Sequence, residues 1–176
     1  MPRTRFVIVP NLALDELVLH YADVASALRL YFSPAAPDFA ARYTGRTQKY
    51  VSDMLALRLD ESDIRSTMAL LTRIEATFRV DFDCRCRKRL KDKLSQHFCD
   101  LKRTSKNYVR LEDILDGWKI HALQTPALIG ELRGAFKFRH WVAHGRYWNP
   151  KLGRKYDFDF VYSVISAILS SFPFES

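Results

Sequence analysis

The chain has few of the residues that make tight turns, with 6 Gly and 7 Pro among 176 residues. This scarcity argues against the many short turns of a β-sandwich or barrel. A Gly-rich phosphate loop, a G-x-S-x-G motif and a dinucleotide fingerprint are also missing, so these signatures do not assign an enzyme class. Hydrophobic residues make up 48% of the sequence, which excludes a disordered chain and allows one compact domain over residues 1–176.

Cysteines and long apolar runs are equally scarce. Cys84, Cys86 and Cys99 are an odd set without a disulfide framework. No apolar run approaches the roughly 20 residues that a membrane-spanning helix needs. The basic N-terminus is followed by an apolar stretch that Pro10 and Asn11 interrupt, so we expect no signal peptide. We therefore predict a protein of the reducing cytoplasm with no membrane partner.

Basic residues outnumber acidic residues in this chain. The sequence has 28 Lys and Arg against 20 Asp and Glu, a net charge of +8. This balance favours an anionic partner, and nucleic acid is the first candidate. The alternative is a basic surface without a function of its own.

The first half of the chain has helical periodicity. Apolar residues recur at helical spacing from Leu14 to Tyr31, with Asn11 as the expected cap, and prolines in 33–37 end the helix. We expect a second helix over 48–59. Polar residues 60–63 then predict the start of a third helix. The apolar stripe of that third helix comprises Ile64, Met68, Leu71, Ile74, Phe78 and Phe82.

The second half also predicts helices. We expect a helix that continues or restarts around Leu94, a polar loop over 102–107, and a short helix or turn over 111–118. Thr125-Pro126 is a helix start signal, and Gly145 ends the helix that begins there. The buried face expected for it comprises Leu128, Leu132, Ala135, Phe136, Val142 and Ala143. A last helix over 158–172, apolar on most sides, should be central. The sequence thus predicts an all-α, single-domain helical bundle of about five to seven helices.

The end of the helix that starts at Pro126 carries the most informative segment, residues 139–148 (RHWVAHGRYW). Arginine keeps its charge and can hold phosphoryl oxygens in a bidentate manner. Histidine exchanges protons near neutral pH. Arg139 and His144 together therefore suit phosphodiester chemistry. The alternative is an ordinary helix end, where basic residues interact favourably with the helix dipole.

Arg139-x4-His144, late in a helix and followed by Gly145, resembles the R-x4-6-H motif of the HEPN superfamily. The small-His-Gly ending over 143–145 also looks like that family, whereas His140 stands where the family most often has Asn. The resemblance implies an all-α HEPN-like fold. It also implies a metal-independent endoribonuclease of a prokaryotic toxin–antitoxin or antiviral defence system, with an antitoxin as partner protein.

The resemblance further implies roles for the motif residues. His144 would act as general base or acid while the ribose 2′-hydroxyl attacks the adjacent phosphate, which gives a 2′,3′-cyclic phosphate. Arg139 would stabilise the charge on the phosphoryl oxygens. His140 would orient these groups or share the proton transfer. The resemblance implies neither a metal nor another cofactor. It does imply a homodimer with one composite site. The alternative is a non-catalytic HEPN-like module that binds nucleic acid or protein.

Helix geometry gives a separate reason to consider a dimer. Positions five apart differ by about 140° around a helix, so Arg139 and His144 do not share a face of a straight helix. His140 and His144, four apart, do share one. A distorted helix end or a second subunit would have to bring arginine and histidine together.

Residues around the motif are candidates for substrate contacts. Lys137 and Arg146 would bind phosphates, and Tyr147 and Trp148 would stack on bases. Glu75 would orient Arg139 or instead form a contact with Arg79 one turn away, and we favour the second. Further basic residues near the motif are Arg133, Lys151, Arg154 and Lys155.

Two other patterns remain open. Residues 85–93 carry six positive charges, which predicts either a strip that contacts phosphates or a solvated helix face. Cys84, Cys86, His97 and Cys99 are zinc-type ligands with unsuitable spacing, so ordinary thiols are expected. His140 and His144 have the spacing of a helical metal pair but lack a third ligand. A metal-dependent hydrolase is thus a third, less favoured interpretation.

Overall fold

The computed structural model describes residues 13–105, 108–121 and 126–175, and these segments contain seven helices and no strand. The all-α class is therefore confirmed. The expected cap Asn11, the loop residues 106–107 and Thr125 lie outside the described residues. The helices are α1 (Leu14–Tyr31), α2 (Phe39–Arg42), α3 (Gln48–Lys88), α4 (Lys93–Thr104), α5 (Leu111–His121), α6 (Pro126–Ala143) and α7 (Phe158–Ser171).

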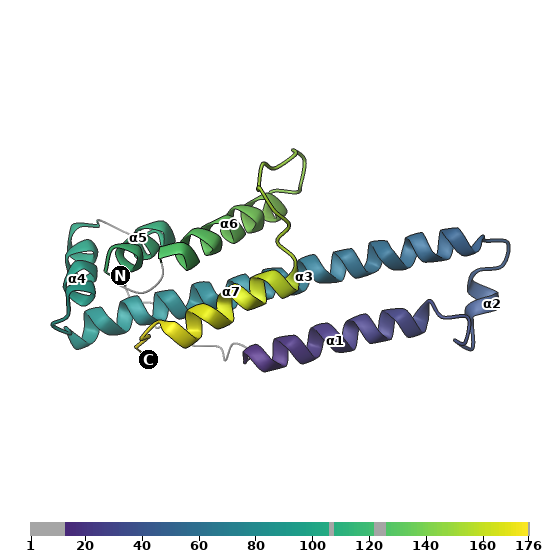
Figure 1. Cartoon of the computed structure of the whole chain (residues 1–176), viewed down its shortest axis with the longest axis horizontal. Coiled ribbons are helices and arrows are strands. Elements are labelled where there is room, and N and C mark those ends of the chain that lie inside the picture. Colours follow the sequence, from purple (N-terminus) through teal and green to yellow (C-terminus); the bar gives the residue numbers. More distant parts are fainter. Residues whose placement is uncertain (1–12, 106–107, 122–125, 176) are drawn as a thin grey trace, which may run out of the picture.

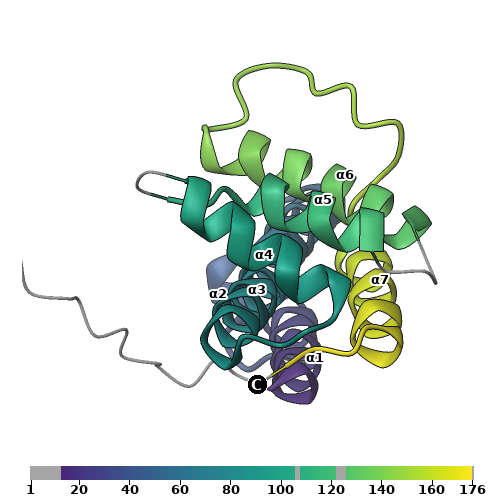
Figure 2. The same ribbon diagram turned by 90° about the vertical axis from the view of Figure 1, so that its left-hand side faces the viewer.

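The helices form two layers (Figures 1 and 2). In one layer α1, α3 and α7 run side by side, and in the other α4, α5 and α6 lie against α3 and α7. One hydrophobic core joins side chains from α1 and from α3 to α7. Within the described segments, no helix combines the length and apolar character that a membrane crossing would require.

The long helix α3 corrects the expectation of two helices over this region. It runs for 41 residues, or about 62 Å, because no Gly or Pro interrupts it. The polar residues 60–63, interpreted as the start of a helix, lie inside it. Asp63 instead caps another helix: its Oδ1 accepts the N–H of Phe158 at 3.2 Å, in the first turn of α7. The same oxygen accepts the hydroxyl of Tyr21 at 3.1 Å, so Asp63 joins α1, α3 and α7.

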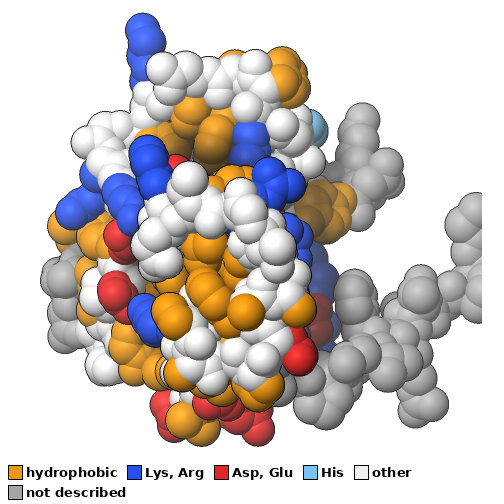
Figure 3. Space-filling view, turned by 90° about the vertical axis from the view of Figure 1, so that its right-hand side faces the viewer, with side chains coloured by type: hydrophobic (Ala, Val, Ile, Leu, Met, Phe, Trp, Pro, Cys, Tyr) orange, Lys and Arg blue, Asp and Glu red, His pale blue; other side chains and the backbone are white. Residues whose placement is uncertain are grey.

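The first half of α3 and the second half of α1, with α2, form an arm (residues 24–60) that extends beyond the other helices (Figure 1). Only a few of its side chains are buried, namely Ala25, Phe32 and Val51. Its end shows hydrophobic side chains on the surface (Figure 3). The large exposed hydrophobic residues of the arm are Leu30, Tyr31, Tyr50 and Leu57.

The predicted apolar stripe of α3 is confirmed where other helices cover it. Leu71, Ile74 and Phe78 are fully buried, whereas Ile64 is only half-buried. The face predicted for α6 is less accurate, because Phe136 and Val142 are half-buried and Ala143 is exposed at the helix end. α7, expected to be central because it is apolar on most sides, is buried along one face, against α3 and α6.

The basic run over 85–93 is divided by the end of α3, which stops at Lys88, and by a turn before α4. Arg85 does not contact solvent as a phosphate-binding residue would. It is 4% exposed and donates from Nε to Asp81 Oδ1 at 2.8 Å and from Nη1 to Ser95 Oγ at 3.2 Å. The remainder of α4 also differs from expectation, since helix continues to Thr104 where a polar loop was predicted to begin at Lys102.

Candidate nucleic-acid site at the end of α6

α6 ends in a backbone arrangement that fixes the two histidines. The N–H of Gly145 bonds the carbonyl of Val142 at 3.2 Å, and that of Arg146 bonds the carbonyl of Trp141 at 3.2 Å. This is the Schellman pattern of helix ends, and Gly145 has the left-handed φ of +85° that it requires. The predicted helix end at Gly145 is confirmed. The N–H of His144 still bonds the carbonyl of His140 at 3.0 Å, so His144 keeps its helical register.

The side chains of His140 and His144 lie together on the surface. Their ring centroids are 4.1 Å apart with the planes inclined by 52°, and both residues are exposed. Trp148, from the loop after α6, places its ring 6.4 Å from that of His140. The shared face expected from the four-residue spacing is therefore present. Two imidazoles at this separation can exchange a proton with a common substrate.

Arg139 lies on the side of α6 that faces α3. Its Nη1 donates a short hydrogen bond to Glu75 Oε2, while Glu75 Oε1 accepts from Nε of Arg79 at 2.9 Å. Both contacts considered for Glu75 thus occur at once, one at each carboxylate oxygen. The side chain of Arg139 is 34% exposed. Glu75 thus binds one terminal nitrogen of this five-donor guanidinium.

Arginine and histidines occupy different sides of α6, as helix geometry requires. No hydrogen bond or ion pair joins Arg139 to His140 or His144 within the described part of the chain. The α6 end is not distorted enough to bring them together in a single subunit. A phosphodiester that contacts all three side chains would therefore have to span the helix end or bind between two subunits.

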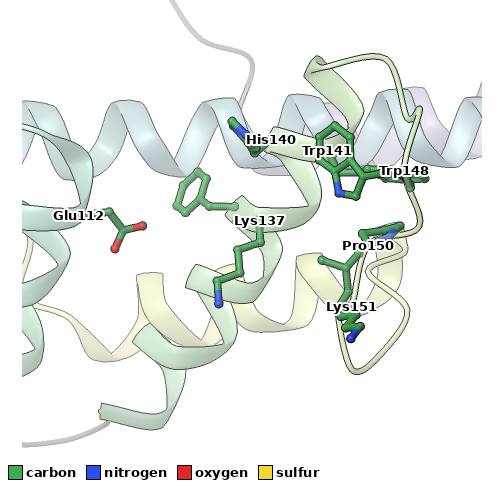
Figure 4. Close-up of a pocket in the computed structure, with 9 residues that line it drawn as sticks. Glu112, Lys137, His140, Trp141, Trp148, Pro150 and Lys151 are labelled. Atoms are coloured by element: carbon green, nitrogen blue, oxygen red, sulfur yellow. Dashed lines mark hydrogen bonds between the residues drawn. The ribbon is translucent and has the colours of Figure 1, made fainter.

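A pocket of about 480 Å³ opens beside His140 (Figure 4). α6 and the loop after it form most of the wall, and a hydrogen bond of 2.7 Å from Trp141 Nε1 to the carbonyl of Trp148 closes the loop onto the helix. The lining residues are Glu112, Phe136, Lys137, His140, Trp141, Trp148, Pro150, Lys151 and Leu152. The wall thus combines indole rings with two lysines, which suits a ligand with both an aromatic base and a phosphate.

Of the side chains predicted to contact substrate, some lie at the pocket or on the surface, whereas Arg146 is already paired with an acidic residue of the protein. Lys137 and Trp148 line the pocket, and Tyr147 is 82% exposed with its ring 4.7 Å from that of Trp148. Arg146 is bound instead, because its two terminal nitrogens donate to the Glu61 carboxylate at 2.8 and 3.1 Å. This hydrogen bonding lowers the pKa of Glu61 and raises that of Arg146. Arg146 therefore ties the loop to α3.

Most other basic residues near the motif also have acidic partners. Arg133 pairs with Glu112 and Asp116, Arg154 with Glu131, and Lys155 with Asp157. Lys137 and Lys151 are the pocket cations for which no ion pair occurs among residues 13–105, 108–121 and 126–175.

Five lining residues were not among the substrate contacts predicted from the sequence, namely Glu112, Phe136, Trp141, Pro150 and Leu152. A cluster of aromatic and proline residues directly after the motif was the available signal for the loop, whereas Glu112 comes from another helix and had none.

The described residues contain no group of three or more His, Cys, Asp or Glu side chains placed to hold a metal ion. Cys84 is buried, in agreement with the expectation of an ordinary thiol. Comparison with protein-family models, curated proteins and solved structures found no match for this chain.

Proposed function

We propose that the end of α6 is the catalytic site of an endoribonuclease that cleaves RNA without a metal and leaves a 2′,3′-cyclic phosphate. The observation that carries the proposal is the pair of exposed imidazoles, His140 and His144, beside a pocket with tryptophans and unpaired lysines. The net charge of +8 favours a polyanionic substrate. The proposed setting is a prokaryotic toxin–antitoxin or antiviral defence system, with an antitoxin as partner.

The proposed reaction is transesterification within the RNA. The 2′-hydroxyl attacks the adjacent phosphorus and its proton passes to His144, while the bond from phosphorus to the 5′ oxygen breaks and that oxygen takes a proton from a second, protonated histidine. Arg139 donates hydrogen bonds to the phosphoryl oxygens, on which charge accumulates. DNA has no 2′-hydroxyl and is therefore not cleaved.

A homodimer is part of the proposal. In an in-line displacement the attacking and leaving oxygens lie on opposite sides of phosphorus. His140 and His144 of one subunit lie on the same helix face and serve one side. A second copy of the chain supplies a histidine for the other side and brings an Arg139 toward the phosphate. Sedimentation at micromolar concentration tests this step, and a monomer under conditions of full activity would contradict it.

The test of the function is cleavage of a labelled single-stranded RNA in excess EDTA. General acid–base catalysis contributes about 10²- to 10⁴-fold, so His144→Ala should lower kcat by that factor. Arg139→Ala should lower kcat by roughly 10²-fold or more. His20→Ala is the matched control, since His20 is an exposed histidine on α1. Mass spectrometry of the fragments should find the cyclic phosphate.

Glu75 is proposed as a positioning residue that acts through Arg139. Glu75→Gln keeps the size of the side chain but weakens its hold on the guanidinium, so kcat should fall while KM changes little. Arg79→Gln is the control, because it removes the other partner of the same carboxylate. A purely structural role for Glu75 would instead lower the melting temperature and leave kcat per folded molecule unchanged.

The alternative outcomes of the assay are distinct. RNA binding without cleavage by either the wild type or His144→Ala would indicate the non-catalytic binding module. Cleavage that stops on chelation and returns with a divalent ion would indicate the metal-dependent hydrolase. Equal loss in His20→Ala and His144→Ala would refute the assignment of the site to α6.

A further inference from the structure

A second pocket, of about 630 Å³, lies between the last turn of α3 and the outer face of α4. Its size is in the range of ligand-binding pockets in proteins. It is separate from the pocket at the end of α6, and no residue lines both. The lining residues are Cys86, Arg89, Leu90, Lys91, Gln96, Cys99, Asp100, Lys102 and Arg103.

Positive charge in this pocket comes from two segments that the sequence did not connect. Arg89 and Lys91 belong to the basic run, and Lys102 and Arg103 follow more than ten residues later in α4. Asp100 is the single acidic residue in the lining. Of the other cations in the run, Arg85 is buried, and Arg87, Lys88 and Lys93 do not line the pocket.

These four cations are available to a ligand. Arg89 and Lys91 are exposed, and no ion pair to either occurs in the described part of the chain. Lys102 pairs with Asp83 at 2.7 Å and Arg103 with Asp100 at 2.9 Å, both through exposed side chains. Exposed pairs of this kind contribute only about 0 to 1 kcal/mol, so a phosphate can replace the carboxylate at little cost.

The turn that presents Arg89 and Lys91 is fixed from inside the protein. The Arg85 guanidinium contacts Asp92 at 3.4 Å and Ser95 at 3.2 Å, which joins the end of α3 to the start of α4. Gln96 Nε2 donates to the carbonyl of Lys91 at 2.6 Å. The cations therefore project from a rigid turn, which reduces the entropy lost when a ligand binds.

No aromatic residue lines this pocket, in contrast to the pocket at the α6 end. Because no aromatic side chain in the wall can stack on bases, the basic side chains of this pocket suit contacts to the phosphates of a nucleic acid. We propose that this pocket binds the phosphate backbone of the substrate at a second point, away from the α6 site, and does so without sequence preference. Naming RNA as that substrate rests on the proposed function, whereas the phosphodiester chemistry is common to RNA and DNA.

The first test uses oligothymidylate, a single-stranded DNA that the proposed reaction cannot cleave, with fluorescence anisotropy as the readout. Each phosphate contact to a single strand adds about 0.7 to the slope of log affinity against log salt. Arg89→Gln/Lys91→Gln should therefore lower the salt slope by about 1.4 and the affinity on the order of tenfold at physiological salt. Arg29→Gln/Arg58→Gln is the matched control, because it removes two exposed arginines outside the pocket.

The second test locates the bound strand through the thiols in the pocket wall. Oligothymidylate should slow alkylation of Cys86 and Cys99 by iodoacetamide, as measured by mass spectrometry. Burial raises the pKa of Cys86 to about 12, so the pocket readout rests mainly on Cys99. Cys84, which is 2% exposed, is the internal control for local unfolding.

The two tests separate the pocket from the catalytic function. Equal loss of affinity in both double variants, or alkylation of Cys99 at an unchanged rate, would refute the pocket while RNA cleavage at the α6 site could still be observed. A specific loss in Arg89→Gln/Lys91→Gln together with protection of Cys99 would support the pocket, even if the protein cleaved no RNA. In that second case the proposed function fails and the phosphate site remains.

Discussion

Replacement of Arg85 by methionine removes the buried cation of α3 and leaves a side chain of similar length. In the wild type the guanidinium joins four parts of the chain. It bonds Asp81 on α3, Ser95 on α4 and the carbonyl of Pro173, and it lies 5.3 Å from the ring centroid of Trp118 on α5. The side chains of Arg85 and Asp81 are 5% and 0% exposed.

The expected loss follows from the buried carboxylate that the variant would leave behind. Breaking a buried ion pair by removal of one partner costs about 3–5 kcal/mol. For a domain of this size that corresponds to a decrease in melting temperature of roughly 6–20 °C. The loss should shrink with acidification, because burial raises the pKa of Asp81 and protonation relieves its charge. A carboxyl group whose pKa is raised in the folded state, such as Asp81, stabilises the fold while it is protonated at low pH. That contribution is lost as the pH rises through its raised pKa.

Urea denaturation followed by circular dichroism measures this loss, with Arg87→Met as the matched control. Arg87 is two residues away in the same helix, but its ion pair with Asp83 is 68% and 53% exposed and should be worth less than about 1 kcal/mol. The double variant Asp81→Asn/Arg85→Met leaves no buried charge and should recover part of the stability lost by Arg85→Met. Equal losses in Arg85→Met and Arg87→Met would refute the role of the buried pair.

Three further predictions concern single positions. A Cβ at Gly134 would lie 1.9 Å from the Tyr156 hydroxyl, so Gly134→Ala should lower the free energy of unfolding by about 1–3 kcal/mol. A Cβ at Gly130 of the same helix would meet open space, so Gly130→Ala should raise the free energy of unfolding by about 0.5–1 kcal/mol. Burial raises the pKa of Tyr21 to about 12, so stability should fall as pH rises above about 10, and Tyr21→Phe should weaken that dependence in urea titrations. Gly145→Ala should cost about 1–2 kcal/mol in thermal unfolding, since its φ of +85° is unfavourable for alanine; an unchanged melting temperature would contradict the cap.

The sequence was sufficient for features that depend on local periodicity. The helix start at Pro126, the end at Gly145 and the buried stripe of α3 follow from spacing and from the backbone preferences of Pro and Gly. The helix break expected at 60–63 was wrong because capping residues predict a helix start only if the preceding helix has ended. Asp63 does accept a hydrogen bond from a helix N-terminus, but that helix begins 95 residues later.

The contacts of the candidate site that could not be predicted from the sequence are ion pairs between residues far apart in the chain. The i,i+4 contact of Glu75 with Arg79 was the simpler expectation, and only the packing of α6 on α3 adds Arg139 to the same carboxylate. Likewise, nothing near Arg146 in the sequence indicates that Glu61 would neutralise it. For a similar reason, a basic run in the sequence does not show which of its side chains are exposed. Arg85 is buried and Arg89 is exposed, although both belong to the same run.

The continuity of α3 has a consequence for how this chain tolerates insertions and deletions. Glu61, Glu75 and Asp81 each bind a partner elsewhere in the chain, at the α6 loop, at α6 and at the C-terminal segment. One residue inserted between Glu61 and Glu75 would turn one set of contacts by about 100° relative to the other, so both could not persist. Among the described residues, no hydrogen bond or ion pair joins the arm before Glu61 to α6 or α7. The arm can therefore change in length by whole helical turns without disturbing those contacts. Length variation should therefore be accepted near α2 and rejected between Glu61 and Arg85.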